Sequence, residues 1–201
     1  MTTPLQHSTA VQKNPDQATK KPLETLRILA IIAFPVILAV VMQRISIEQP
    51  LKAGDAAPDL FLQSLNGESF SLRELYSRRL AVLFFSVDCP HCRTELKDVE
   101  TLRATFRESV QLLLITTSER VRTKSLLDSL GISAPVAIDE KGRAQSAFGV
   151  VMLPATFLIN AHGIIHASSF GERSLDVRRE QLESFLLATA DGIGTPNHSP
   201  R

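Results

Sequence analysis

Short apolar runs alternate with amphipathic stretches along residues 52–189, and this alternation predicts an α/β domain. The runs that predict strands are 80–86, 110–115, 135–138 and 153–159, and the stretches with helical spacing are 90–107, 118–130, 142–148 and 174–189. Continuous apolar runs are typical of strands that are buried on both faces of a sheet. We therefore expect a partly parallel central sheet with helices on both faces.

Turn signals before the first of these buried strands and after the last one predict two β-hairpins. Asn66-Gly67 follows the apolar segment 60–65, and an Asn-Gly pair between apolar segments is a strong hairpin signal. A second turn at 160–163 leads into a strand that is predicted at 164–167. The expected sheet is therefore mixed rather than wholly parallel.

Two of the predicted helices carry apolar side chains at helical spacing, and we expect these side chains to form the buried helix faces. They are Leu96, Val99, Leu102 and Phe106 in the first helix, and Val177, Leu182, Phe185 and Leu186 in the last.

The most apolar part of the chain is the uncharged run 28–42, which lies between Arg27 and Arg44. It is shorter than the roughly 20 residues that a bilayer-spanning helix needs, so we expect flanking residues to extend it to a span over 23–47. The run has no polar face, which disfavours a buried globular helix. No pattern of small residues follows it, which favours an uncleaved anchor over a cleaved signal peptide. More Lys and Arg residues precede the span than follow it, so we expect the folded domain outside the cytoplasm.

The remaining segments complete a four-part organisation. Residues 1–22 are polar without apolar periodicity and predict a disordered cytoplasmic extension, and 191–201 predict a flexible tail. The folded domain is therefore expected at 48–190. With 201 residues, of which 44% are apolar, the chain is long enough for one such domain. Its net charge of +1 and the lack of a long basic run disfavour a nucleic-acid partner.

The two cysteines of the chain, Cys89 and Cys92, are separated by Pro90 and His91 and stand between the first buried strand and its following helix. A helix N-terminus stabilises a thiolate through its N–H groups and dipole, and a proline is tolerated in the first turn. His91 adds a polarisable or positive neighbour. We predict that Cys89 is the exposed nucleophile and that Cys92, one turn into the helix, is the resolving thiol. This dithiol chemistry needs no cofactor or metal.

Other uses of a cysteine pair remain open at this point. Together with His162 and His166 the pair has the residue types of a zinc site, although the separation is longer than in a small zinc finger. A structural disulfide is disfavoured because it would close a very short loop. Two inert buried cysteines are the third alternative.

The chain resembles the thioredoxin superfamily, specifically the membrane-anchored TlpA/ResA-like, AhpC/TSA-related thiol–disulfide oxidoreductases, over about residues 52–189. The resemblance rests on G-x-x-A-P-D at 54–59, F-F-S at 84–86, C-P-H-C-R-x-E at 89–95 and L-P-A-T-F-L-I at 153–159. It implies a thioredoxin-like fold with an inserted βα segment. It also implies that Pro154 is a cis-proline that faces the cysteine pair and supports substrate binding.

Two departures from the family pattern concern proton transfer and redox direction. Leu83 aligns with the buried acid of thioredoxin, so Asp88 or Glu95 is the expected proton acceptor, although for each acid a solvated surface position is the simpler interpretation. The Pro-His dipeptide between the cysteines matches the periplasmic oxidase DsbA, whereas the rest of the scaffold resembles reductases. We expect the protein to act as a reductant, because its scaffold resembles that of reductases.

These features predict a single-pass protein of the bacterial inner membrane with its catalytic domain in the periplasm or outside. Its expected substrates are exported proteins that contain cysteine, as in cytochrome c maturation, and a membrane partner is expected to restore its dithiol. The alternatives are a DsbA-like oxidant, a peroxidase and a copper- or zinc-binding chaperone. For a peroxidase, Ser86-x-x-Cys89 fits the pattern, but Val82 stands where that pattern has proline.

Overall fold

The computed structural model describes residues 31, 33–35, 37 and 49–190, and contacts divide the chain into the units Met1–Ile47 and Glu48–Arg201. The described residues of the first unit are helical, and Ile31, Phe34 and Ile37 have exposed side chains. Within the described ranges, no helix combines the length and the hydropathy that a bilayer span requires.

Several segments predicted from the sequence fall on residues that the structure does not describe. They are the polar extension 1–22, most of the span 23–47 and the tail 191–201. The proposed limits of these segments, and of the domain between them, stay predictions.

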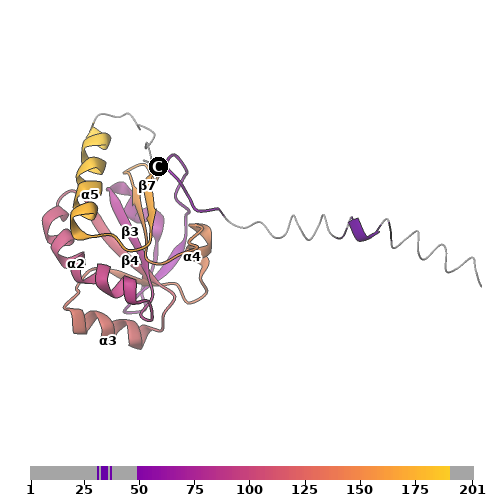
Figure 1. Cartoon of the computed structure of the whole chain (residues 1–201), viewed down its shortest axis with the longest axis horizontal. Helices are drawn as coiled ribbons and strands as arrows, with labels where there is room; N and C mark the ends of the chain where they lie inside the picture. Colours follow the sequence, from indigo (N-terminus) through magenta and orange to yellow (C-terminus); the bar gives the residue numbers. More distant parts are fainter. Residues whose placement is uncertain (1–30, 32, 36, 38–48, 191–201) are drawn as a thin grey trace, which may run out of the picture. The chain divides into compact units, whose positions relative to one another are not determined.

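Residues 49–190 form a seven-stranded mixed sheet with the strand order β2-β1-β5-β4-β3-β6-β7 (Figure 1). The central strands β3, β4 and β5 are parallel. Strand β6 pairs antiparallel with β3, β7 pairs antiparallel with β6, and β1 of the β1–β2 hairpin pairs antiparallel with β5. The strands are β1 Phe61–Ser64, β2 Ser69–Ser71, β3 Leu80–Phe85, β4 Gln111–Thr116, β5 Val136–Ile138, β6 Ala155–Ile159 and β7 Ile165–Phe170. The helices are the 3-10 helix η2 Leu72–Ser77 and the α-helices α2 Pro90–Phe106, α3 Arg120–Leu130, α4 Arg143–Ala147 and α5 Leu175–Ala190.

Strand β3 lies near the middle of the sheet, and all six of its residues are buried because both faces of the sheet are covered. Leu83 and Phe85 pack against side chains of α2 and α3 on one face. Val82 and Phe84 face the other side, where Phe148 and other aromatic residues form a separate cluster. In Figure 1, α2, α3 and α5 lie on one side of the sheet and α4 on the other.

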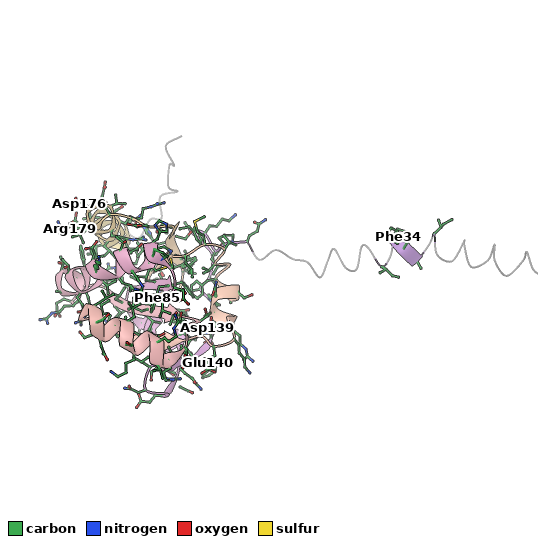
Figure 2. The ribbon with its side chains drawn as sticks, turned by 60° about the horizontal axis from the view of Figure 1, so that its bottom comes forward. Phe34, Phe85, Asp139, Glu140, Asp176 and Arg179 are labelled. Carbon is green, nitrogen blue, oxygen red and sulfur yellow. The ribbon has the colours of Figure 1, made fainter. Side chains whose placement is uncertain are left out.

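Among the residues labelled in Figure 2, Asp139 caps a helix. Asp139 directly follows β5 and accepts hydrogen bonds from the backbone N–H groups of Arg143 and Gln145 at 2.8 and 2.9 Å. These groups would otherwise lack partners at the start of α4. In contrast, Asp176 and Arg179 are exposed on α5.

The mixed α/β architecture predicted from the apolar pattern is confirmed, and each predicted strand and helix of the domain is present within a few residues of its expected bounds. The position of the first hairpin was not predicted. It joins the sheet beside β5, because Gln63 and Ser64 pair with Ile138 and Ala137.

Candidate active site

The cysteine pair lies between the end of β3 and the first turn of α2. Cys89 is the N-cap residue of α2, with Pro90 in the first turn. The backbone N–H of Cys92 donates to Sγ of Cys89 at 3.2 Å. Charge-assisted bonds from an N–H group favour an anionic acceptor, and the helix dipole acts in the same direction. The sulfur of Cys89 therefore lies at the start of α2 with a backbone N–H donor directed at it.

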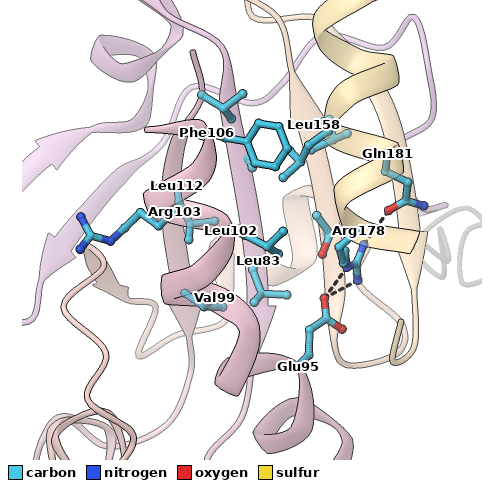
Figure 3. A pocket seen from close by; sticks show the side chains of 14 residues that line it. Leu83, Glu95, Val99, Leu102, Arg103, Phe106, Leu112, Leu158, Arg178 and Gln181 are labelled. Carbon is cyan, nitrogen blue, oxygen red and sulfur yellow. Dashed lines mark hydrogen bonds and ion pairs between the residues drawn. The ribbon is translucent and has the colours of Figure 1, made fainter. Parts of the chain in front are cut away.

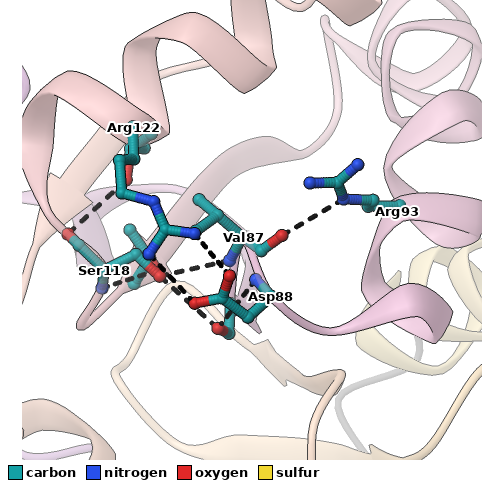
Figure 4. A network of polar contacts seen from close by, with 8 residues as sticks. Val87, Asp88, Arg93, Ser118 and Arg122 are labelled. Atoms are coloured by element: carbon teal, nitrogen blue, oxygen red, sulfur yellow. Dashed lines mark hydrogen bonds and ion pairs between the residues drawn. The ribbon is translucent and has the colours of Figure 1, made fainter.

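The loop before the pair is held by bonds to its backbone. The backbone N–H of Val87 donates to Oγ of Ser118 at 3.1 Å. The carbonyl of Val87 accepts a bond from Nε of Arg93 at 3.1 Å. Figure 4 shows these contacts on either side of Val87. The cysteine pair is thus fixed to both α2 and the segment that precedes α3.

The two thiols differ in accessibility, and both are free in this structure. Cys89 is partly exposed, whereas Cys92 has 0% exposure. Burial raises the pKa of Cys92 to about 12, and its hydrogen bond with Cys89 and the nearby Glu95 act in the same direction. The arrangement presents one thiol for attack and keeps the other protonated beneath it.

This asymmetry predicts selective alkylation of the reduced protein. At pH 8 the Cys92 thiolate is about 10⁴-fold less populated than its thiol, since its pKa is about 12. We expect iodoacetamide to add one carbamidomethyl group, on Cys89, as read by mass spectrometry of the digested protein. The Cys89→Ser variant is the control and should remain largely unmodified. Comparable modification of both cysteines would contradict the assignment.

Pro154 stands beside the exposed thiol, as the resemblance implied. The Leu153–Pro154 peptide bond is cis, and the carbonyl oxygen of Leu153 lies 3.9 Å from Sγ of Cys89. Strand β6 begins directly after Pro154 and pairs with β3, which places the two segments side by side. Val151 and Met152, just before this bond, are 67% and 57% exposed. Apolar surface therefore borders the accessible sulfur.

His91 is exposed and bound to a carboxylate that the sequence pattern did not indicate. Its Nδ1 lies 2.7 Å from Oε2 of Glu172, which follows β7. A carboxylate in this position offsets the positive charge of a protonated imidazole. The carboxylate of Glu172 therefore adds a negative charge next to His91, and the Pro-His dipeptide alone does not indicate it.

Asp88, the first of the two predicted proton acceptors, is exposed and forms an ion pair with Arg122 of α3 (Figure 4). The hydrogen bond from Arg122 is the largest cause of a lowered pKa at Asp88. A carboxylate with a lowered pKa is a weak base, so this pair disfavours Asp88 as the proton acceptor.

Glu95, the second predicted acceptor, is not on the surface. It lies one turn after Cys92 on α2, is 3% exposed, and forms an ion pair with Arg178 of α5, which is 5% exposed (Figure 3). Burial raises the pKa of Glu95, while the charge of Arg178 opposes that effect. The surface interpretation of Glu95 is wrong, because Arg178 supplies the opposite charge that its burial needs.

The sequence pattern was not interpreted as placing Arg178 in the core, and the residue before it was assigned to the wrong face of the last helix. Val177 was expected in the buried face of the last helix, but it is 38% exposed, and Arg178 occupies the buried position. Arg178 stands four and seven residues before Leu182 and Phe185, which are both buried. A charged residue in register with an apolar stripe was the available signal.

The zinc alternative lacks its set of ligands. Among the described residues, no three His, Cys, Asp or Glu side chains gather as a metal site would require. His162 lies in the turn between β6 and β7, and the ring of His166 packs against Phe185 with ring centres 5.0 Å apart. The cysteine pair and these histidines therefore do not form one site.

Comparison with known proteins assigns the fold and a family. The AhpC/TSA family matches residues 53–168 of the chain. The thiol-disulfide oxidoreductase ResA of Halalkalibacterium halodurans is 31% identical over 137 residues, which cover 66% of this chain and 78% of that protein.

Two solved structures show the same fold at lower identity. A thiol:disulfide interchange protein of the thioredoxin family from Chlorobium tepidum has a TM-score of 0.56 at 24% identity and covers 66% of this chain and 97% of its own. Peroxidoxin BcpB from Mycobacterium tuberculosis has a TM-score of 0.61 at 22% identity, covering 69% and 97%. The thioredoxin-like fold is thereby confirmed, while the fold alone does not separate disulfide exchange from peroxide reduction.

Proposed function

Because the chain belongs to the AhpC/TSA family and is a thioredoxin-like thiol–disulfide oxidoreductase of the ResA type, we propose that it reduces disulfides of exported proteins while tethered to a membrane. The observation that carries this proposal is the unequal pair of thiols at the start of α2. Cys89 is accessible and accepts a bond from the N–H of Cys92, while the Cys92 sulfur lies buried behind it.

The reaction proceeds by two thiol–disulfide exchanges. The Cys89 thiolate attacks one sulfur of the substrate disulfide, forms a mixed disulfide, and releases the other substrate sulfur as a thiolate. Cys92 then loses its proton and attacks Sγ of Cys89. A Cys89–Cys92 disulfide forms, and the second substrate sulfur leaves as a thiolate that takes up a proton. The substrate gains two electrons and the dithiol loses two.

Glu95 is the proton acceptor that the geometry favours in the second exchange. It lies on the same face of α2 as Cys92, since residues three apart on a helix are neighbours. Its raised pKa makes it a better base than Asp88, whose pKa Arg122 lowers. The acid of plain thioredoxin is replaced here by Leu83, so α2 supplies the carboxylate instead of β3.

The charge around His91 supports the reducing direction. A positive imidazole beside Cys89 would stabilise the thiolate, and a stabilised reduced form makes a dithiol more oxidising. Glu172 offsets that charge at 2.7 Å. A DsbA-like oxidant, which uses the same two cysteines, is the alternative outcome of the test below.

Membrane tethering is proposed from the apolar run 28–42. The described residues of this run are helical, with the side chains of Ile31, Phe34 and Ile37 exposed at 72%, 69% and 60%. Apolar side chains on the outside of a helix are stable when lipid surrounds them. We further propose that the catalytic domain lies in the periplasm or outside, that a membrane partner restores the dithiol, and that apocytochromes c are among the substrates.

The proposal is tested by disulfide reduction and by the reduction potential of the pair. We expect the full chain in detergent to reduce insulin with dithiothreitol well above background. We also expect its potential, from equilibration in glutathione buffers, to lie closer to the value of about −270 mV of thioredoxin than to the value of about −120 mV of DsbA. A value near that of DsbA would reverse the direction. Consumption of hydrogen peroxide without insulin reduction would instead favour a peroxidase.

A further inference from the structure

The buried ion pair between α2 and α5 is asymmetric. Nε of Arg178 donates to Oε1 of Glu95 at 2.6 Å, and Nη2 forms an ion pair with the same oxygen. Nη1 donates to Oγ of Ser169 at 2.6 Å and to Oε1 of Gln181 at 3.1 Å. Figure 3 shows the guanidinium between the carboxylate and Gln181. The orientation of Arg178 is therefore fixed by side chains from α2, β7 and α5.

The second carboxylate oxygen is left without a partner. Oε2 of Glu95 is buried and makes no hydrogen bond to the described residues, and the same holds for Oγ1 of Thr156 on β6. Both residues border a small cavity of about 50 Å³ whose walls are mainly apolar, formed by side chains such as Leu83, Val99 and Leu158. A buried carboxylate oxygen without a donor is costly in such surroundings, so its retention here calls for a use.

We propose that Arg178 is a positioning residue for the second exchange: it binds Oε1 of Glu95 and leaves Oε2 to accept the proton of Cys92. This inference rests on the proposed function, and specifically on Glu95 as the base. In the step, the S–H bond of Cys92 breaks, an O–H bond forms at Oε2, and the new thiolate attacks Sγ of Cys89. The proton passes on to solvent or to the departing substrate thiolate before the next cycle.

Arg178 also keeps the acceptor ionised. Burial raises the pKa of Glu95, and Arg178 is the largest opposing cause, with a smaller opposing contribution from Arg173. The other titratable group near the carboxylate is Cys92 on its own helix. From β6, β7 and α5 the neighbours are Thr156, Ser169 and Gln181, which are neutral, and Arg103 borders the cavity from α2. Loss of Arg178 therefore leaves Glu95 more protonated near neutral pH.

The test separates the two exchanges within one reaction. Reduced full-length protein in detergent is mixed with 5,5′-dithiobis(2-nitrobenzoate), and release of thionitrobenzoate is followed by stopped flow between pH 5 and 9. The first phase reports attack by Cys89 and depends on reagent concentration. The second phase reports attack by Cys92 on the mixed disulfide and is independent of concentration. Absence of the first phase in the unaltered protein would count against the proposed function itself.

In R178Q we expect the acid limb of the second phase to move at least about one pH unit higher, since an opposite charge lowers a carboxyl pKa by about 1–3. At pH values below both acid limbs the second phase should slow about tenfold, while the first phase stays within about twofold. R178K, which keeps the charge, should restore part of the rate. R179Q is the matched control, because Arg179 is exposed on the same helix (Figure 2). Its profile should overlie that of the unaltered protein.

A double-mutant comparison distinguishes positioning from a merely structural role. E95Q should slow the second phase by about 10²-fold and remove its acid limb. Adding R178Q to E95Q should then change the second phase by less than about twofold, because the group through which Arg178 acts is gone. If R178Q alone does not fold, the comparison of E95Q with E95Q/R178Q, together with R178K, still tests the inference. An equal slowing by R178Q with and without Glu95, or an unshifted profile in R178Q, would overturn the inference.

Discussion

Cys92→Ser is expected to convert the protein from a catalyst into a trap. Cys89 keeps its place at the N-terminus of α2 and the N–H bond from residue 92, so it still attacks substrate disulfides. The serine hydroxyl does not displace the bound substrate, so mixed disulfides accumulate. Insulin reduction should fall to background. Acid-quenched samples from cells that express the variant should show adducts on non-reducing gels, which mass spectrometry identifies.

The matched control for the trap is Cys89→Ser. In this variant Cys92 is still buried and still has a raised pKa, so we expect neither adducts nor insulin reduction. Adducts on Cys89→Ser and none on Cys92→Ser would reverse the assignment of the two thiols. The identity of the trapped proteins tests the proposed substrates, because exported proteins with cysteine, including apocytochromes c, are expected among them.

The sequence predicts the fold of residues 49–190 well because the signals that determine it are local. Strand β3 reads as a continuous apolar run since it is buried on both faces, and α2 has its apolar residues at helical spacing. The register of β1 against β5 has no local signal. Gln63 and Ile138 become neighbours only when the hairpin adds to the assembled sheet.

The chemistry of the site was predicted unevenly for a related reason. Cys89, Cys92 and Pro154 belong to contiguous motifs, whereas the charges that surround them come from distant parts of the chain. His91 and Glu172 are 81 residues apart in sequence, and Glu95 and Arg178 are 83 apart. Charged side chains are rarely buried in proteins, so a charged residue in a sequence is expected at the surface. Only Arg178 across the helix interface makes the burial of Glu95 favourable, and no local pattern indicates that these two residues pair.

Removal of the Glu95 carboxylate is expected to be the most destabilising single change near the site. In Glu95→Ala the Arg178 guanidinium stays buried without its anion, and it does not lose its proton in the physiological pH range. Breaking a buried pair in this way typically costs about 3–5 kcal/mol of unfolding free energy. Urea unfolding of the reduced protein at pH 7 measures this cost. The double variant Glu95→Met with Arg178→Met removes both charges and should recover most of it.

Arg178→Ala is expected to behave differently, because its unpaired partner can become neutral. Without the guanidinium, burial raises the pKa of Glu95 further above its usual 4.5. Above pH 4.5 and below that raised value, the folded state binds more protons at Glu95 than the unfolded state does. Stability of this variant should therefore fall as pH rises through that window, and its deficit should be smallest at acidic pH. In Glu95→Ala the deficit should not change in this manner, since Arg178 remains charged throughout. A cost below about 1 kcal/mol for Glu95→Ala, or the same pH dependence in both variants, would mean that the pair is not buried as an ion pair in solution.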